Sequence, residues 1–399
     1  MRNTNSIVGL GLSIVLVAVL AVPACRWLEL REPDGVLYGY TDEVPSPPIK
    51  PIRAFFDKTL QHWIEKYFEV HLGFRALLIR SFNELNFRIF REAPKLRLYT
   101  TQAHGLYSKM SIESINEELV RRASLEDRYQ VEAEKLLRVQ RYFLSQGKYF
   151  GVVIATSKPY VYSDDLGTRY LVGGGDGIYE RTASFGKVLH ESGVNVIDGG
   201  PLLRKFRAAT GIDTHPKSGV HWNYYAGCLV ARQLIDDIRH SQFPKMPMLD
   251  CGIPQMAESH MVDIDGLLLL NIWSNGGITK PSPYPVVDRT DDSVWRPNIV
   301  FIGDSFSDQI RFALQQANIY LRMTTSGYFR VREIDDRVAN LTIAADIKAD
   351  ESAVREDIMK DIANSEVIIL EMVDYNVGRW GYGFSDYVLQ DFSSQETIH

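Results

Sequence analysis

Four short apolar runs constrain the fold of this chain more than any other feature of its sequence. Each run is rich in Val, Ile, Leu or Phe without polar alternation, which is typical of a strand buried on both faces of a sheet. Segments with helical spacing separate the runs, among them residues 222–240. Strands that alternate with helices predict an α/β fold, a three-layer α/β/α sandwich with a mainly parallel sheet. The runs are residues 149–155, 194–198, 298–303 and 367–371.

The N-terminal region contains an uncharged, mostly apolar stretch, Ile7 to Ala24, of about the length that crosses a bilayer as a helix. We expect an uncleaved membrane anchor within residues 1–25. A cleaved signal peptide, a lipoprotein cysteine at Cys25 and a buried core helix are the alternatives. All but the last place the remaining chain outside the cytoplasm, so we expect a periplasmic protein held at the inner membrane.

A linker and a helical extension are predicted between that stretch and the main domain. Residues 26–52 contain five prolines and little periodicity, which is typical of an extended linker. Residues 53–110 contain apolar side chains spaced three and four apart, which indicates helices. The main domain, residues 111–399, opens with a long helical pattern that ends at Gly147 and has Ser111 as its cap candidate.

The composition excludes several classes of function. Lys and Arg number 44 against 50 Asp and Glu, a formal net charge of −6, which argues against a nucleic-acid-binding surface. Three cysteines in 399 residues argue against a disulfide framework and against metal–thiolate chemistry. We expect no metal and no cofactor. In an oxidising compartment Cys228 and Cys251 could form a disulfide, and two small buried side chains are the equal alternative.

The run at residues 298–303 leads into the sequence Gly303-Asp304-Ser305, followed by the start of a helical pattern. Ligands of parallel sheets bind at the carboxyl ends of the strands, so a serine at this point has an exposed hydroxyl. Backbone N–H groups there can stabilise a developing oxyanion, and Gly303 allows a tight turn. We therefore predict Ser305 as a nucleophile. An ordinary strand-to-helix turn with a capping side chain is the alternative.

A serine nucleophile needs a base, and two histidines precede it in one loop-like segment. Asp213 and His215 are two residues apart, so in an extended segment their side chains share a side and the carboxylate can orient the imidazole. His221 lies immediately before the helical pattern of residues 222–240. Either histidine could be the base, and either could be a polar residue with only a structural role.

Taken together, the Gly303-Asp304-Ser305 motif, the Asp213-Thr214-His215 element and His221-Trp222 resemble the alginate O-acetyltransferase family, a group of SGNH hydrolase-like periplasmic proteins. The family motif is Asp-x-His-Trp, but here Gly219 stands two positions before His221. The resemblance favours His221 as the base, with His215 as the alternative. Asp213 is then the acid with His215, or reaches His221 across a loop, or is absent from a Ser-His dyad.

The resemblance also implies an oxyanion site and substrate contacts. A glycine and an asparagine assist the nucleophile's N–H in such enzymes, which points to Gly303 and Asn275. Lys158 and Tyr160 follow the first apolar run, at the edge where a carbohydrate would bind. The implied activity is acetyl transfer to an exopolysaccharide, supplied by an integral-membrane acyl-transfer partner and assembly proteins. A sugar acetyl-esterase and a non-catalytic polysaccharide-binding or scaffold protein are the alternative functions.

Overall fold

The structure is a computed structural model. It describes residues 36–39, 44–71, 74–91, 98–101, 105–182, 184–275, 277–290, 295–339, 341–343 and 350–396. The predicted membrane stretch and most of the predicted linker lie outside these residues. Among the residues described, no helix is both long enough and apolar enough to cross a membrane.

Two compact units make up the chain. The first comprises residues 1–96 together with residues 267–277, and the second comprises residues 97–266 and 278–399. In the first unit, three helices occupy the region where helical spacing predicts an extension. They are α2 (Pro51–Phe56), α3 (Thr59–His71) and α4 (Arg75–Phe90).

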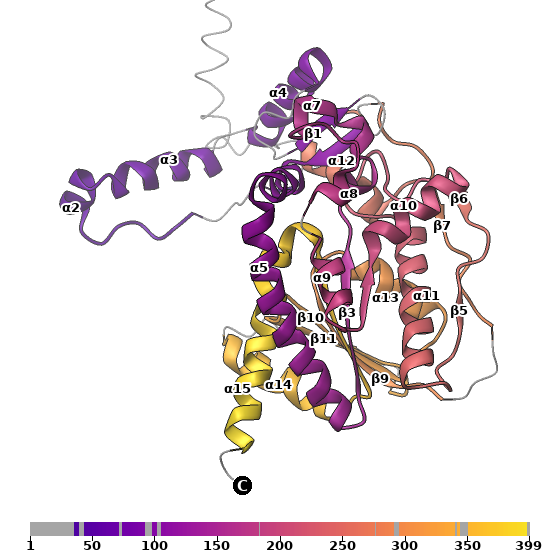
Figure 1. The fold of residues 1–399 in the computed structure, drawn as a ribbon. Coiled ribbons are helices and arrows are strands. Elements are labelled where there is room, and N and C mark those ends of the chain that lie inside the picture. The colour runs from indigo at the N-terminus through magenta and orange to yellow at the C-terminus, as the bar shows by residue number, and fades with distance from the viewer. Residues whose placement is uncertain are drawn as a thin grey trace, which may run out of the picture. The chain divides into compact units, whose positions relative to one another are not determined.

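The second unit alternates strands and helices, as the apolar runs predict (Figure 1). Its strands are β1 (Leu98–Thr101), β2 (Gly105–Ser108), β3 (Tyr149–Ala155), β4 (Val196–Asp198), β5 (Leu249–Asp250), β6 (Gln255–Ala257), β7 (Ser282–Tyr284), β8 (Asp288–Arg289), β9 (Asn298–Gly303), β10 (Arg322–Gly327), β11 (Val331–Asp336), β12 (Leu341–Ile343) and β13 (Val367–Val373). Its longer helices are α5 (Lys109–Ser145), α9 (Phe185–Glu191), α10 (Gly199–Thr210), α11 (Tyr224–Ser241), α13 (Ser307–Gln316), α14 (Glu351–Ala363) and α15 (Phe384–Glu396). The short helices are α6 (Lys158–Val161), η1 (Ser163–Asp165), α7 (Gly167–Tyr170), α8 (Ile178–Arg181), η2 (Met261–Ile264) and η3 (Asp374–Gly383). Helix α12 (Asp265–Leu270) begins in the second unit and ends in the first.

A seven-stranded sheet with the order β12-β11-β10-β9-β13-β3-β4 forms the centre of the second unit. From β10 to β4 each neighbouring pair of strands is parallel. The strands β11 and β12 extend the β10 edge in antiparallel pairing. All four predicted strands are therefore present, and the mainly parallel sheet is confirmed.

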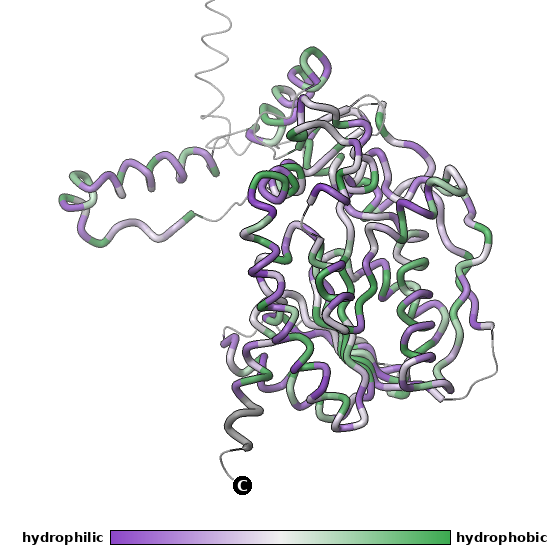
Figure 2. The backbone as a smooth tube through the Cα atoms, in the orientation of Figure 1, coloured by the Kyte–Doolittle hydropathy of each residue, from purple (hydrophilic) through white to green (hydrophobic). Residues whose placement is uncertain are grey.

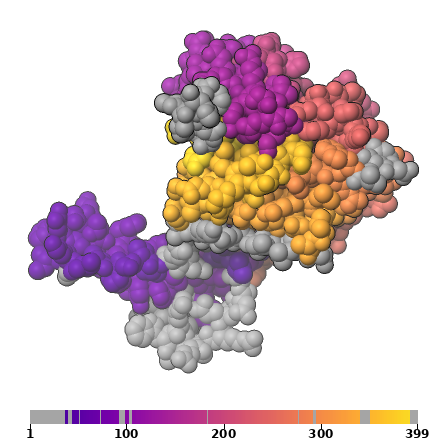
Figure 3. Space-filling view, turned by 90° about the horizontal axis from the view of Figure 1, so that it is seen from below, coloured from indigo at the N-terminus to yellow at the C-terminus, as the bar shows by residue number. Residues whose placement is uncertain are grey.

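Helices cover both faces of this sheet because the central strands are apolar on both sides. In β9, Ile299 and Phe301 belong to one core, whereas Val300 and Ile302 belong to the other. The first core is closed by α10, α11 and α13, and the second by α5, α9, α14 and α15. The ribbon coloured by hydropathy shows the central strands as a mostly apolar layer (Figure 2). Within the second unit, α15 and η3 contact α5. The space-filling view shows the C-terminal residues as one continuous yellow to orange surface (Figure 3).

Two local features of the second unit refine the sequence predictions. The long helix begins at Lys109, so Ser111 lies inside it and donates a hydrogen bond to the Ser108 carbonyl rather than capping its start. Cys228 in α11 and Cys251 form a disulfide, with their Cα atoms 5.9 Å apart. The disulfide therefore ties α11 to the segment that follows β5.

Candidate active site

The carboxyl end of β9 presents Ser305 on the surface. Strand β9 is buried from Ile299 onward, and Ser305 is exposed in the turn that leads into α13. The N–H of Ser305 donates no hydrogen bond within the described part of the chain, so it is available to an incoming oxyanion. The turn thus offers both a hydroxyl and a free N–H at the sheet edge.

Asp304 fixes this turn. One oxygen of its carboxylate accepts a hydrogen bond from the Phe306 N–H at 3.0 Å. The other accepts from the Val373 N–H, from the Asn376 amide and from the Tyr382 hydroxyl, at 3.2, 3.2 and 2.9 Å. Four donors around one carboxylate hold it in a single position. The serine turn is therefore anchored to the end of β13 and to η3.

Gly303 has a packing role behind the serine. A Cβ atom at this position would lie 2.5 Å from an oxygen of Glu371, which is fully buried on β13. That oxygen accepts the Asp304 N–H at 2.8 Å. Burial, reinforced by the nearby Asp304 charge, raises the pKa of Glu371 well above its usual range. Gly303 is predicted from the sequence as an oxyanion residue, but the structure gives it close contact with a buried carboxyl.

The loop before α11 carries His221. Asn223 caps the helix, its side-chain oxygen accepting the Ala226 N–H at 2.8 Å. Trp222 is fully buried, and its indole N–H donates to the Phe306 carbonyl at 2.9 Å and to Gln309 at 3.0 Å. Because Phe306 follows the nucleophile, Trp222 ties the start of α11 directly to the serine turn.

Ser305, His221 and Asp265 form a hydrogen-bonded series. His221 Nε2 lies 2.7 Å from Ser305 Oγ, and His221 Nδ1 is hydrogen-bonded to Asp265 Oδ2. A carboxylate can only accept a hydrogen bond, so Nδ1 carries the proton and Nε2 is left to accept from the serine. This is the arrangement of a nucleophile, a base and an orienting acid.

Asp265 is the residue that sequence reasoning missed. It opens α12, and its Oδ1 accepts the N–H groups of Val220 at 2.9 Å and Gly266 at 2.7 Å. These bonds fix the carboxylate beside His221. Burial acts to lower the pKa of His221, but the hydrogen bond and charge of Asp265 outweigh it, and the pKa is raised above its usual value.

The structure corrects the predicted Asp213–His215 pair. His215 is buried, with Nε2 donating to the Thr156 carbonyl at 3.0 Å and Nδ1 accepting from Thr214 at 3.1 Å. Burial lowers the pKa of His215 to about 3, so the ring is neutral. Asp213 instead accepts a hydrogen bond from Tyr162 at 3.1 Å and lies 4.0 Å from Arg207. Both residues stabilise the loop, and His221 is the histidine beside the serine.

Lys158 also has a different position from the one predicted. Its side chain is 1% exposed, and its ammonium group donates to the carbonyls of Leu106, Pro216 and Gly219 at 2.9, 2.6 and 3.3 Å. Burial lowers the pKa of Lys158 to about 7. Lys158 therefore stabilises the loop that carries His221 and is not exposed to a carbohydrate.

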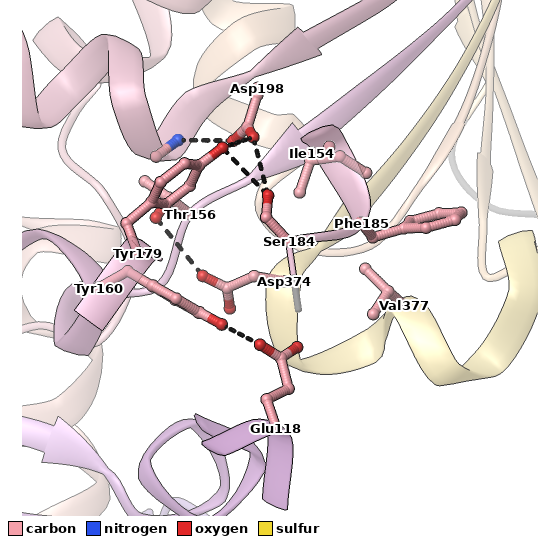
Figure 4. Close-up of a pocket in the computed structure, with 12 residues that line it drawn as sticks. Glu118, Ile154, Thr156, Tyr160, Tyr179, Ser184, Phe185, Asp198, Asp374 and Val377 are labelled. Carbon is pink, nitrogen blue, oxygen red and sulfur yellow. Dashed lines mark hydrogen bonds between the residues drawn. The ribbon is translucent and has the colours of Figure 1, made fainter. Parts of the chain in front are cut away.

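Tyr160 lies in a buried polar pocket, not on the surface (Figure 4). Its hydroxyl is hydrogen-bonded to Glu118, which also accepts from Tyr129 at 3.0 Å. Burial raises the pKa of Glu118 to about 8 and that of Asp374 to about 7. The pocket encloses about 30 Å³, which is too small for a sugar ring, so we assign these residues a structural role.

Asn275 belongs to the first unit, where its side-chain oxygen accepts the Gly277 N–H at 3.0 Å. Its predicted oxyanion role thus stays a prediction. Near Ser305, the structure adds Tyr328, whose side chain interacts with that of Ser305 and whose N–H donates to the Gly303 carbonyl at 2.9 Å. In the described residues, no group of three or more His, Cys, Asp or Glu side chains is arranged to hold a metal ion.

No protein-family model matches the sequence, and no curated protein matches it significantly. Three solved structures show distant structural similarity, all below the level at which similarity indicates a function. The O-acetyltransferase domain of Pseudomonas putida AlgJ is 14% identical, with a TM-score of 0.39 over 73% of this chain and 99% of that one. Pseudomonas aeruginosa AlgX is 11% identical, with a TM-score of 0.40 over 73% and 65%. Bacillus cereus PatB1 is 10% identical, with a TM-score of 0.36 over 63% and 90%.

Proposed function

We propose that this chain is an extracytoplasmic O-acetyltransferase of the SGNH hydrolase-like type, which moves an acetyl group from an ester donor to hydroxyl groups of an exopolysaccharide. The observation that carries the proposal is the hydrogen-bonded series Ser305, His221 and Asp265 at the carboxyl edge of a mainly parallel sheet. This geometry suits attack on a carbonyl carbon.

In the first half of the reaction, Ser305 Oγ forms a bond to the acetyl carbon while His221 Nε2 takes the hydroxyl proton. The charge that develops on the carbonyl oxygen is stabilised by the Ser305 N–H. The bond from that carbon to the donor's alkoxy oxygen then breaks, and His221 returns the proton to this leaving oxygen. An acetyl group remains on Ser305.

In the second half, His221 removes a proton from a sugar hydroxyl, and the sugar oxygen attacks the acetyl carbon. The bond to Ser305 breaks and the serine takes the proton back. Asp265 stabilises the charged imidazole in both halves. No external oxidant, metal or cofactor enters these steps.

The proposal includes the origin of the acetyl group and the place of reaction. An integral-membrane partner would pass acetyl groups across the inner membrane to this chain, alongside exopolysaccharide assembly proteins. The apolar stretch from Ile7 to Ala24 and the sequence resemblance to periplasmic acetyltransferases support this part of the proposal.

A sugar acetyl-esterase would use the same side chains with water as the acceptor. The exposure of Ser305 favours this second function, since water can reach the serine. The two functions differ only in which acceptor resolves the acetyl-serine.

Intact-mass analysis with a soluble acetyl-ester donor tests the proposal. We expect the chain to gain one acetyl group, and Ser305→Ala to gain none. Ser307→Ala is the matched control, because Ser307 begins α13 directly after the turn and donates its hydroxyl to the Asp304 carbonyl at 2.7 Å. Oligosaccharide acceptors then distinguish transfer from hydrolysis by acetyl-sugar or free acetate. Absence of both adduct and turnover in folded protein would favour a polysaccharide-binding or scaffold function.

A further inference from the structure

The helices α2, α3 and α4 of the first unit expose an unusual amount of apolar surface. Helix α3 has none of its 13 residues buried, although it is strongly amphipathic. Its apolar side chains recur three and four residues apart and lie on one face, at Leu60, Trp63, Ile64, Tyr67 and Phe68. Its opposite face carries Gln61, His62, Glu65, Lys66 and Glu69. Figure 2 shows the two kinds of residue alternating along this helix.

Helix α4 exposes a row of apolar side chains on the face opposite its buried one. Its buried face includes Phe87 and Asn83, and the Asn83 amide donates to the Leu270 carbonyl at 2.9 Å within the same unit. The opposite face has an exposed apolar row with spacings of four, three and four residues. This row is Leu78, Phe82, Leu85 and Ile89, with exposed fractions of 39, 54, 58 and 60%.

Helix α2 and Ile49, which precedes it, also expose apolar side chains. Ile49 and Phe56 are 96% and 80% exposed, and Ile52 and Phe55 are exposed as well. Soluble proteins rarely expose apolar side chains on several successive elements unless another surface covers them. The first unit therefore needs a partner.

The charge of this region indicates what that partner is. Residues 44–91 contain eight Lys and Arg against four Asp and Glu, whereas the whole chain has a net charge of −6. The positive excess comes from α2 and α4 and the residues beside them, because α3 itself carries two Glu against one Lys. Helices with aromatic and aliphatic side chains on one face and excess positive charge bind anionic lipid surfaces. The apolar stretch that ends at Ala24 lies only 25 residues before Ile49, so the two are at most roughly 80–90 Å apart even if the chain between them is fully extended.

We propose that α2, α3 and α4 lie in the interface of an anionic lipid bilayer, with the exposed apolar faces defined above buried among the acyl chains. This proposal does not depend on the catalytic one, since it uses no residue of the second unit. The proposal gives the first unit a function of its own, which is to bind a lipid surface.

Spin-label accessibility in the full chain tests the proposal in the presence of the N-terminal stretch. With Cys25→Ser, the remaining native cysteines are in the Cys228–Cys251 disulfide, so a nitroxide attaches only at an introduced cysteine. Phe68→Cys and Leu85→Cys report the two apolar faces, and Glu65→Cys reports the polar face of α3. The chain is reconstituted in vesicles of phosphatidylglycerol and phosphatidylethanolamine, and separately in phosphatidylcholine.

We expect labels at positions 68 and 85 to be several-fold more accessible to oxygen than to a water-soluble nickel complex, and the label at 65 to show the reverse. The contrast should weaken in phosphatidylcholine, because the electrostatic contribution is lost. Equal accessibility of all three labels to the nickel complex would overturn the proposal. Dipolar broadening at 68 or 85 that disappears on dilution with unlabelled chain would overturn it too, because a second copy would then cover these faces.

Discussion

The carboxylate of Asp265 packs closely against Gly219, so that a side chain at position 219 would crowd it. A Cβ atom at Gly219 would come within 3.0 Å of Asp265 Oδ1. In the Asp-x-His-Trp motif that the sequence resembles, the acid stands two positions before the histidine, which is position 219 here. Position 219 lacks a side chain, and the carboxylate hydrogen-bonded to His221 comes instead from Asp265, 44 residues further along the chain. In the proposed mechanism Asp265 is therefore the acid.

Asp265→Asn should reduce kcat/KM for acetyl transfer by about 10³- to 10⁴-fold, because the amide favours the wrong tautomer of His221. His221 acts as a base when neutral, and Asp265 raises its pKa, so wild-type activity should fall as pH drops through a value above 6.5. In the variant this fall should occur at lower pH. A pH–rate profile measures both effects. Asp213→Asn is the control, and an unmoved acid limb in Asp265→Asn would contradict the assignment.

Gly219→Ala should lower activity while leaving the sheet intact. The added Cβ would lie 2.7 Å from the Val262 carbonyl oxygen and 2.8 Å from Pro216, so the loop must shift and carry Asp265 or His221 with it. A displacement of this kind costs about 10²-fold in rate. Steady-state kinetics with circular dichroism measure it, and Gly378→Ala is the matched control, since a Cβ there meets nothing within 4 Å. Wild-type kinetics in Gly219→Ala would show that the loop tolerates the shift.

Lys158→Met should destabilise the second unit by about 2–4 kcal/mol, since several buried carbonyls lose their donor. Activity should fall as well, because Lys158 holds the loop before His221. Urea unfolding gives the free energy, and Lys217→Met controls for loss of a nearby lysine. If Lys158 contacted substrate instead, KM would rise with stability unchanged.

Glu118→Gln should change the pH dependence of stability. Burial raises the pKa of Glu118 from its ordinary value near 4.5 to about 8, so the folded chain holds a proton that the unfolded chain releases between these values. The free energy of unfolding of the wild-type chain should therefore fall as pH rises from 5 to 8. The variant should lose less free energy over the same range, and the two losses should differ by more than about 1 kcal/mol. Unfolding at both pH values measures the difference. The exposed Glu117→Gln should keep the wild-type slope.

Removing the disulfide with the double substitution Cys228→Ser and Cys251→Ser should lower the free energy of unfolding by about 3 kcal/mol, because the disulfide closes a loop with a sequence separation of 23. Denaturant unfolding with and without a reducing agent measures the change. The variant should be insensitive to the reducing agent, whereas the native chain should lose stability in it. Equal stability in all four conditions would contradict the expectation.

The central strands were predictable from the sequence because short, continuous apolar runs are typical of strands buried on both faces of a sheet. The sequence did not predict β10 and β11, whose residues Arg322–Gly327 and Val331–Asp336 are largely polar. These strands are specified by pairing with β9 and with each other, which is a tertiary effect that local pattern does not contain.

The candidate site was predictable only in part. Ser305 and His221 each adjoin an element with a strong local pattern, a buried strand and an amphipathic helix. Asp265 adjoins no such pattern, and proximity in sequence pointed to Asp213 instead. The carboxylate of Asp213 accepts a hydrogen bond from Tyr162 and forms an ion pair with Arg207. Lys158 and Tyr160 follow a strand at the expected edge, but their full burial depends on carbonyl groups and on Glu118 brought in from elsewhere in the fold.

The anchoring of Asp304 also sets an order for assembly. Its partners Val373, Asn376 and Tyr382 lie 69, 72 and 78 residues further along the chain. A polypeptide is synthesised from its N-terminus, so the serine emerges well before the groups that fix its turn. Ser305 gains this geometry only when residue 382 has joined the fold, and a partly synthesised chain carries the serine without a positioned turn.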